Sequence, residues 1–123
     1  NYENNILLNL KKYKIKFICL AGYMKIISDN LIKKYPKKII NIHPSLLPKF
    51  KGLNTFSRIL RNKEIKTGCT VHYVNEKLDS GNIINKKMFF IRSRDNELIL
   101  KKKTQKLEYR AFPEAIVKIF RNI

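Results

Sequence analysis

Three polar side chains in this sequence have types and spacing that could activate a carbonyl group. Asn41 and His43 stand two residues apart at the end of the apolar stretch 37–42, directly before a proline. Residues two apart in a strand point to the same face, so both side chains can address one ligand atom. Asp79 belongs to a later turn, and it can approach His43 if the strands expected at 37–42 and 68–75 are neighbours.

Such a trio suits acyl transfer. An acyl carbon under attack develops negative charge on its oxygen, and an amide or imidazolium N–H that stabilises this charge contributes about 3–4 kcal/mol. A carboxylate near the ring favours the charged imidazolium, and it can accept the proton that an attacking amine loses, directly or through water. No Ser, Cys or Thr stands as an obvious activated nucleophile, which favours direct transfer. The simpler alternative is that Asn41 and His43 cap a loop and that Asp79 is an ordinary turn residue.

His72 is a further candidate. It shares one face of the expected strand 67–75 with Thr70 and Val74, so it could line the same site. It could equally be an interior histidine whose hydrogen bonds are satisfied, and both interpretations stay open.

The elements that must position these residues alternate between helix and strand. They are expected at residues 5–14, 15–23, 28–36, 37–42, 54–63, 67–75, 82–91 and 96–108, in the order helix, strand, helix, strand, helix, strand, strand, helix. Pro113 is expected to interrupt or kink the last helix, before a final helix that runs to Phe120. Strands separated by helices indicate an α/β fold with a sheet that is largely parallel in its first part. Ligands of such sheets collect at the carboxyl ends of the strands.

The composition bounds the class of protein. The 123 residues suit one domain, and 27 Lys and Arg against 9 Asp and Glu leave a charge of +18, which would suit nucleic acid or an anionic membrane. Because the lysines are scattered and accompany many Ile and Asn residues, we interpret the charge as compositional bias. Cys19 and Cys69 lie in apolar stretches, which predicts buried, reduced thiols.

Several features are missing from this sequence. It has no metal-ligand spacing, no apolar stretch near the roughly 20 residues of a membrane span and no signal peptide, and it begins without Met. We therefore expect a cytoplasmic protein with no metal and no membrane partner, and we do not expect nucleic acid as a partner.

Four motifs carry a resemblance. They are AGYMKIIS, NIHPSLLPKFKGLNT, TGCTVHYVNEKLDSGNII and LEYRAFPEAI, in that order. With them the chain resembles the phosphoribosylglycinamide formyltransferase family, folate-dependent enzymes of purine synthesis, from about Ile15 to Phe120. The resemblance implies a three-layer αβα, Rossmann-like sheet that is mostly parallel and lacks its N-terminal strands. It also implies transfer of a formyl group from 10-formyltetrahydrofolate to the amine of phosphoribosylglycinamide, on the route to IMP.

The resemblance implies a role for each residue of the trio. His43 is the general acid that protonates the tetrahedral intermediate, Asn41 holds the formyl oxygen, and Asp79 keeps His43 charged and helps to remove the proton of the amine. Glu108 corresponds to a residue that contacts the glycinamide substrate, and we group His72 with it as substrate-binding. The implied folate pocket comprises Met24, Lys25, Ile26, Ile27, Asn41, Asn75, Glu76, Lys77, Leu78 and Asp79. The alternative is that its isoleucines are only core residues.

The sequence also departs from the family pattern. The glycine-rich loop that holds the substrate phosphate, and the strands and helices that precede it, have no counterpart in residues 1–123. Asn54 and Phe56 stand where family members often have histidines, and Lys25 replaces a frequent arginine. We therefore expect a single incomplete domain that binds phosphoribosylglycinamide poorly by itself. A sheet without its first strands also exposes an apolar edge, which could aggregate or pair with another chain, for example as a homodimer.

Three other functions are compatible with parts of this sequence. Formyltetrahydrofolate deformylase shares the Asn, His and Asp but uses water as acceptor, and methionyl-tRNA formyltransferase carries a further domain and would benefit from the basic charge. The alternative that involves no catalysis is a basic fragment that binds nucleic acid through its lysines. It predicts affinity that falls steeply with salt and does not depend on His43.

Overall fold

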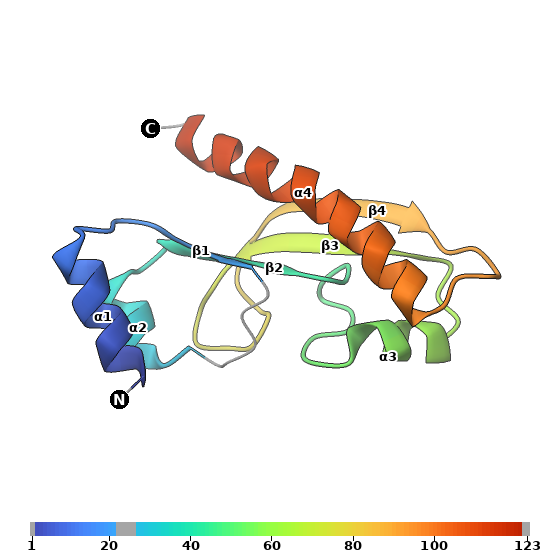
Figure 1. Ribbon diagram of the computed structural model, residues 1–123, viewed down its shortest axis with the longest axis horizontal. Coiled ribbons are helices and arrows are strands. Elements are labelled where there is room, and N and C mark those ends of the chain that lie inside the picture. Colours follow the sequence, from blue (N-terminus) through green and yellow to red (C-terminus); the bar gives the residue numbers. More distant parts are fainter. Residues whose placement is uncertain (1, 22–26, 122–123) are drawn as a thin grey trace.

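The eight expected elements are present, in the expected order. The computed structural model describes residues 2–21 and 27–121. The elements are α1 (Tyr2–Lys12), β1 (Ile18–Ala21), α2 (Asp29–Lys34), β2 (Ile39–His43), α3 (Thr55–Arg61), β3 (Lys66–Tyr73), β4 (Ile83–Phe90) and α4 (Glu97–Arg121). The predicted α/β class is confirmed (Figure 1).

The four strands form one sheet in the order β1-β2-β3-β4. The parallel pairing expected in the first part of the sheet is found between β1 and β2, with α2 as the crossover. The other two pairings are antiparallel, so the sheet of the described residues is mixed. Strand β3 turns directly into β4, which is the connection that antiparallel neighbours allow.

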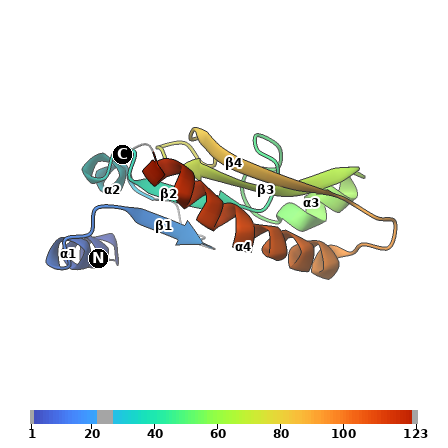
Figure 2. The ribbon, with the colours of Figure 1, turned by 90° about the horizontal axis from the view of Figure 1, so that it is seen from above.

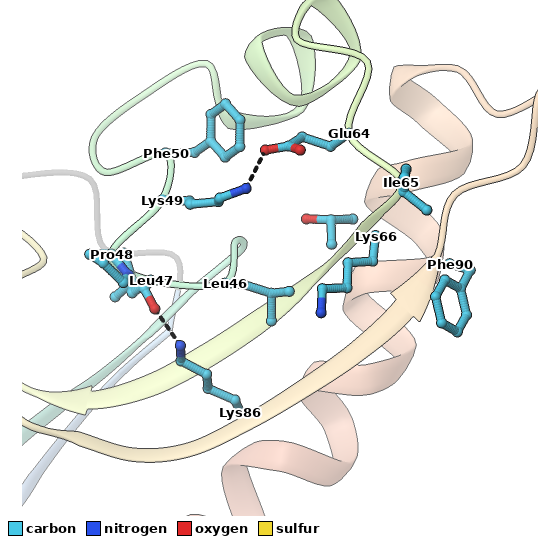
Figure 3. Close-up of a pocket in the computed structure, with 11 residues that line it drawn as sticks. Leu46, Leu47, Pro48, Lys49, Phe50, Glu64, Ile65, Lys66, Lys86 and Phe90 are labelled. Atoms are coloured by element: carbon cyan, nitrogen blue, oxygen red, sulfur yellow. Dashed lines mark hydrogen bonds and ion pairs between the residues drawn. The ribbon is translucent and has the colours of Figure 1, made fainter.

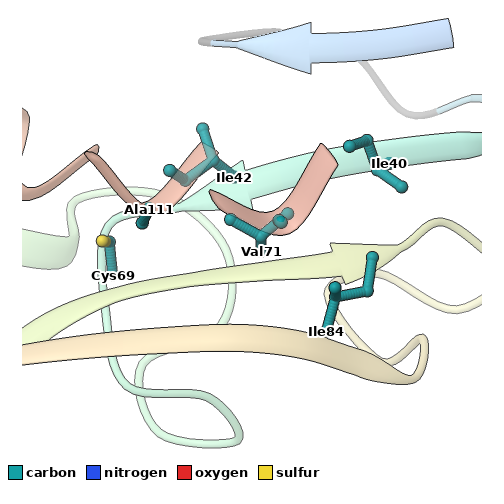
Figure 4. Close-up of a cluster of buried hydrophobic side chains, with 7 residues drawn as sticks. Ile40, Ile42, Cys69, Val71, Ile84 and Ala111 are labelled. Atoms are coloured by element: carbon teal, nitrogen blue, oxygen red, sulfur yellow. The ribbon is translucent and has the colours of Figure 1, made fainter. Parts of the chain in front are cut away.

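Helices cover both faces of the sheet. Helix α4 runs along one face, where Ile40, Ile42 and Val71 pack with Ala111 in a buried cluster (Figures 1 and 4). Helices α1 and α2 pack on the opposite side of the sheet (Figure 1), where Leu7, Leu31, Ile32 and Ile39 form a second cluster. Seen from above, α4 crosses in front of the strands (Figure 2). This arrangement gives the three layers that the resemblance implied.

Two expectations about this frame are wrong. Pro113 does not interrupt the last helix, because α4 continues through it to Arg121, and there is no separate final helix in the described residues; the alternative of a kink at Pro113 stays a prediction. A proline removes the hydrogen bond to the carbonyl four residues earlier, here that of Tyr109, whose side chain is 76% exposed. Water can satisfy a carbonyl on such an exposed side of a helix. Cys19 is exposed rather than buried, because it lies on β1, at the edge of the described sheet, whereas Cys69 is buried as predicted.

Candidate active site

Strand β2 presents Asn41 and His43 on the face of the sheet that α4 does not cover. Ile40 and Ile42 belong to the cluster under α4, and side chains alternate along a strand, so Asn41 and His43 point away from α4. The backbone of β2 is paired on both sides, to β1 and to β3. The two side chains therefore leave a backbone that is held rigidly.

Strand β3 places His72 beside them. Asn41 and His72 are opposite each other in the antiparallel pairing, and His43 is opposite Thr70. Residues directly opposite in such a pair share a face, with Cβ atoms roughly 5 Å apart. His72 is 2% exposed, so it lies inside the molecule at this site.

The turn after β3 brings Asp79 to the same place. Asp79 adopts a left-handed backbone conformation (φ 49°), which Asp tolerates better than most residues. Gly81 lets the turn close, because a Cβ there would lie 1.6 Å from the carbonyl oxygen of Tyr73. The carboxylate Oδ2 accepts a hydrogen bond of 2.8 Å from the backbone N–H of Gly52, which fixes the side chain.

Both nitrogens of the His43 ring face acceptors. Nε2 lies 2.8 Å from the carbonyl oxygen of Phe50, and because a carbonyl only accepts, Nε2 carries a proton. Nδ1 lies 3.5 Å from Oδ2 of Asp79, which is longer than a good hydrogen bond but within ion-pair distance. The structure thus brings His43 and Asp79 together, and both side chains are only 7% exposed. One of the two contacts must lengthen before His43 can donate a proton to a ligand.

His72 presents a bare nitrogen to the site. Its Nδ1 lies 2.9 Å from the carbonyl oxygen of Tyr73 and must donate to it. Burial lowers the pKa of His72, and the nearby His43 lowers it further. The hydrogen bond to Tyr73 and the charge of Asp79 raise the pKa, but the effect of burial is larger. The ring is therefore neutral at pH 7. Its Nε2 is an acceptor that has no hydrogen-bond partner among residues 2–21 and 27–121 and lies 3.8 Å from Oδ1 of Asp79. We treat this contact as two facing acceptors rather than an ion pair, since the ring is uncharged.

Asn41 adds another unpartnered acceptor. Its Oδ1 is buried and has no hydrogen-bond partner among the described residues. Buried polar atoms are satisfied in most proteins, and an exception calls for a bound donor such as water or a ligand. Asn41, His72 and Asp79 together present acceptors to one region, which is therefore suited to an amine or a water molecule.

Sequence reasoning missed the residues that hold the loop after β2. The hydroxyl of Thr70 donates to the carbonyl oxygen of Ser45 (2.7 Å) and accepts from the N–H of Leu47 (3.1 Å). Ser45 in turn donates to the carbonyl oxygen of Lys49 (2.6 Å). These bonds hold the loop whose Phe50 carbonyl contacts His43. The only available signal was that Thr70 shares a strand face with His72.

The implied folate-binding residues are only partly described. Met24, Lys25 and Ile26 lie outside the described residues. Ile27 packs partly buried against the cluster of α1 and α2, as a core residue would. The loop 75–79 has an exposed Leu78 (56%) and a turn in which Oδ1 of Asn75 accepts from the N–H of Lys77. The pocket stays a prediction.

Glu108 lies apart from the trio. It projects from α4, which packs on the other face of the sheet. Burial raises the pKa of the Cys69 thiol, and the charge of Glu108 raises it further. Burial raises the pKa of Glu108 itself. The carboxylate is half-buried on the helix, and its contact with substrate stays a prediction.

The chain shares its sequence pattern with known proteins. A family profile described as formyl transferase matches residues 1–116. The chain belongs to the formyl transferase family. Within residues 2–21 and 27–121 of this formyl transferase chain, no helix is long and apolar enough to cross a membrane. Within the same residues, no group of three His, Cys, Asp or Glu side chains could hold a metal ion.

The relatives of this formyl transferase chain include enzymes of purine synthesis. It is 43% identical over 107 residues to the trifunctional purine biosynthetic protein adenosine-3 of Gallus gallus. The aligned segment covers 87% of this chain and 11% of that protein. Phosphoribosylglycinamide formyltransferase from Bacillus halodurans superimposes with a TM-score of 0.92 at 39% identity, over 96% of this chain and 61% of that one. A formyltetrahydrofolate deformylase from Pseudomonas syringae matches with a TM-score of 0.88 at 26% identity, over 92% and 38%. The chain thus spans about a tenth of the trifunctional relative and about three fifths of the solved formyltransferase.

Proposed function

We propose that this chain carries the centre that transfers a formyl group from 10-formyltetrahydrofolate to the amine of phosphoribosylglycinamide, in purine synthesis. The observation that carries the proposal is the convergence of Asn41 and His43, from strand β2, with Asp79, from the turn after β3, on one face of the sheet. The identity to formyltransferases of purine synthesis supports this acceptor.

In this proposal His43 supplies the proton. The carboxylate of Asp79 near Nδ1 stabilises the charged ring, and the N–H that His43 frees from its present contact is directed to the oxygen of the formyl group under attack. Asn41 aims its amide N–H at the same oxygen. A donor placed in this way contributes about 3–4 kcal/mol, because it acts where charge develops.

The unpartnered acceptors hold the amine. An attacking nitrogen has N–H groups to donate. Among the described residues, Oδ1 of Asn41 and Nε2 of His72 have no hydrogen-bond partner and can accept them, and Oδ1 of Asp79 lies 3.8 Å from Nε2 of His72. Asp79 then takes the proton that the nitrogen loses on forming the new C–N bond. When the tetrahedral intermediate collapses, the bond between the formyl carbon and N10 of the folate breaks, the oxygen returns its proton to His43, and N10 takes up one proton so that tetrahydrofolate leaves. His72 contributes as a neutral acceptor, which its lowered pKa favours. Glu108 is proposed to contact the glycinamide part of the substrate.

The co-substrate would be held by residues 24–27 and 75–79, with Asn41. The apolar side chains among them would cover the heterocycle, and the backbone of the loop would read its donors and acceptors. We further propose that residues 1–123 form one incomplete domain, with phosphate binding supplied by other residues, since the solved relative contains a larger chain. We also propose that the partners are small molecules, that the protein is cytoplasmic and that it assembles as a homodimer.

The experiment offers one formyl donor to three acceptors. The complete gene product is incubated with 10-formyltetrahydrofolate and either phosphoribosylglycinamide, water alone or methionyl-tRNA, and the formylated product is quantified. The proposal expects transfer to phosphoribosylglycinamide to be fastest. Release of formate at the same rate without an amine would instead identify a deformylase, and formylated methionyl-tRNA would identify the third enzyme.

A further inference from the structure

A hollow of about 620 Å³ lies on the same face of the sheet as His43, towards the other end of β3 (Figure 3). This volume lies within the range of roughly 300–1,000 Å³ that small-molecule sites occupy. Its walls are the loop after β2, the start of β3 and strand β4. We call it the β3–β4 groove.

The β3–β4 groove is separate from the formyl-transfer centre. Lys66 is opposite Phe90 and Thr70 is opposite Lys86, so these four residues share the face on which His72 lies. Lys66 and His72 are six residues apart along β3, which corresponds to roughly 20 Å. The loop held by Thr70 stands between the two sites.

The groove has positive charge that the protein does not neutralise. Of its three lysines, Lys49 forms an ion pair of 2.9 Å with Glu64, the only acid in the lining, and Lys86 donates to the carbonyl oxygen of Leu47. The ammonium group of Lys66 has no partner among residues 2–21 and 27–121. In Figure 3 the side chain of Lys66 points along the groove.

Large apolar side chains line the groove together with Lys66. Ile65 is 74% exposed and Phe90 66% exposed, and both line the groove with Leu46 and Phe50. An apolar rim next to an unpaired cation complements a ligand with an apolar body and one anionic group. The volume of this half-open groove suits a small molecule, whereas nucleic acid would be expected to use a row of free cations.

The loop that walls the groove also contacts His43. Phe50 is one of the residues that line the groove, and its carbonyl oxygen accepts from Nε2 of His43. A ligand that packs against Phe50 therefore acts on the same residue that holds the ring. We propose that the β3–β4 groove binds a small amphiphilic carboxylate through Lys66 and the apolar rim, and that its binding is transmitted to His43 through the loop 45–50.

The test uses naphthalene-2-carboxylate as the anionic probe and naphthalene-2-carboxamide as its neutral match, added to the full 123-residue chain. Backbone amide NMR spectra locate binding, and the ring signals of His43 report the coupling, since the chain has only two histidines. The carboxylate should shift residues 46–50, 64–67 and 90 together with the His43 ring, with one common Kd. The carboxamide should bind more weakly.

Two variants identify the contacts. Lys66→Gln should weaken carboxylate binding about two- to fivefold and leave carboxamide binding unchanged, as expected for a partly exposed ion pair. Phe90→Ala should weaken both probes. Lys102→Gln, the same change on an exposed position of α4, is the control and should alter neither.

Two results would overturn the proposal. Carboxylate binding that is equal in Lys66→Gln and the unmodified chain, or shifts confined to other surfaces, would remove the site. Shifts in the groove while the His43 ring signals stay constant would remove the coupling. Neither readout depends on formyl transfer, so these failures are distinct from a failure of the proposed function.

Discussion

Replacing Thr70 by valine should destabilise the protein, because its buried hydroxyl makes two hydrogen bonds to the loop after β2. The side chain is 0% exposed, and valine has a similar size without the hydroxyl. The change would leave the N–H of Leu47 and the carbonyl oxygen of Ser45 without this partner. Ser45 is 0% exposed and Leu47 2% exposed, so water would not easily replace the hydroxyl.

The magnitude follows from these two bonds. A hydrogen bond contributes about 0.5–1.5 kcal/mol net, and a buried group left unsatisfied costs about 1–3 kcal/mol. Because the loop can relax in part, we expect Thr70→Val to lower the free energy of unfolding by about 2–4 kcal/mol. Urea unfolding followed by circular dichroism measures this as a lower midpoint with an unchanged m-value.

Thr104 provides a matched control. It is also 0% exposed, but its hydroxyl has no hydrogen-bond partner among the described residues. Thr104→Val removes a buried hydroxyl that makes no hydrogen bond among the described residues. The change should therefore leave the free energy of unfolding unaltered or raise it by about 1 kcal/mol. If Thr70→Val loses no more stability than Thr104→Val, the hydrogen bonds of Thr70 do not hold the loop.

Three further predictions concern titratable groups. Because the pKa of His72 is lowered in the folded chain, the unfolded chain takes up this proton first as the pH falls below about 6.5, so the free energy of unfolding should fall by at most about 1.4 kcal/mol per pH unit. His72→Gln should reduce this slope in urea titrations. An unchanged slope would show that His72 does not cause the pH dependence. Because burial raises the pKa of Glu108, its charged form lowers the stability of the fold. Glu108→Gln should therefore raise the Tm at pH 7 but not at pH 3, which is below the ordinary glutamate pKa of 4.5. Equal Tm shifts at both pH values would contradict this. Iodoacetamide at pH 8 should modify the exposed Cys19 and spare Cys69, because burial raises the pKa of the Cys69 thiol to about 12. An intact-mass spectrum that shows two adducts on the native chain would refute this prediction.

The elements and the alignment of Asn41 with His43 could be predicted because both depend on local pattern. Apolar periodicity identified the strands, and a spacing of two residues placed both side chains on one face. The approach of Asp79 needed one further assumption, that the second and third strands are neighbours, which the pairing of β2 with β3 satisfies.

Other features could not be read from residue types. The partner of His43 is the backbone carbonyl of Phe50, and every residue has such a carbonyl. The exposure of Cys19 follows from its position on an edge strand, which an apolar stretch does not reveal. The continuation of α4 through Pro113 depends on which side of the helix faces water. Each of these is decided by tertiary contacts.

The most direct test of the proposed centre is the rate of formyl transfer from 10-formyltetrahydrofolate to phosphoribosylglycinamide by the complete gene product carrying Asp79→Asn. Asparagine keeps the shape of the side chain and can still accept from the N–H of Gly52, so the fold should survive. The charge beside His43 and the acceptor of the amine proton are lost, so the rate should fall by about 10²–10⁴-fold with an unchanged circular dichroism spectrum. A folded variant that transfers the formyl group at the original rate would contradict the proposal.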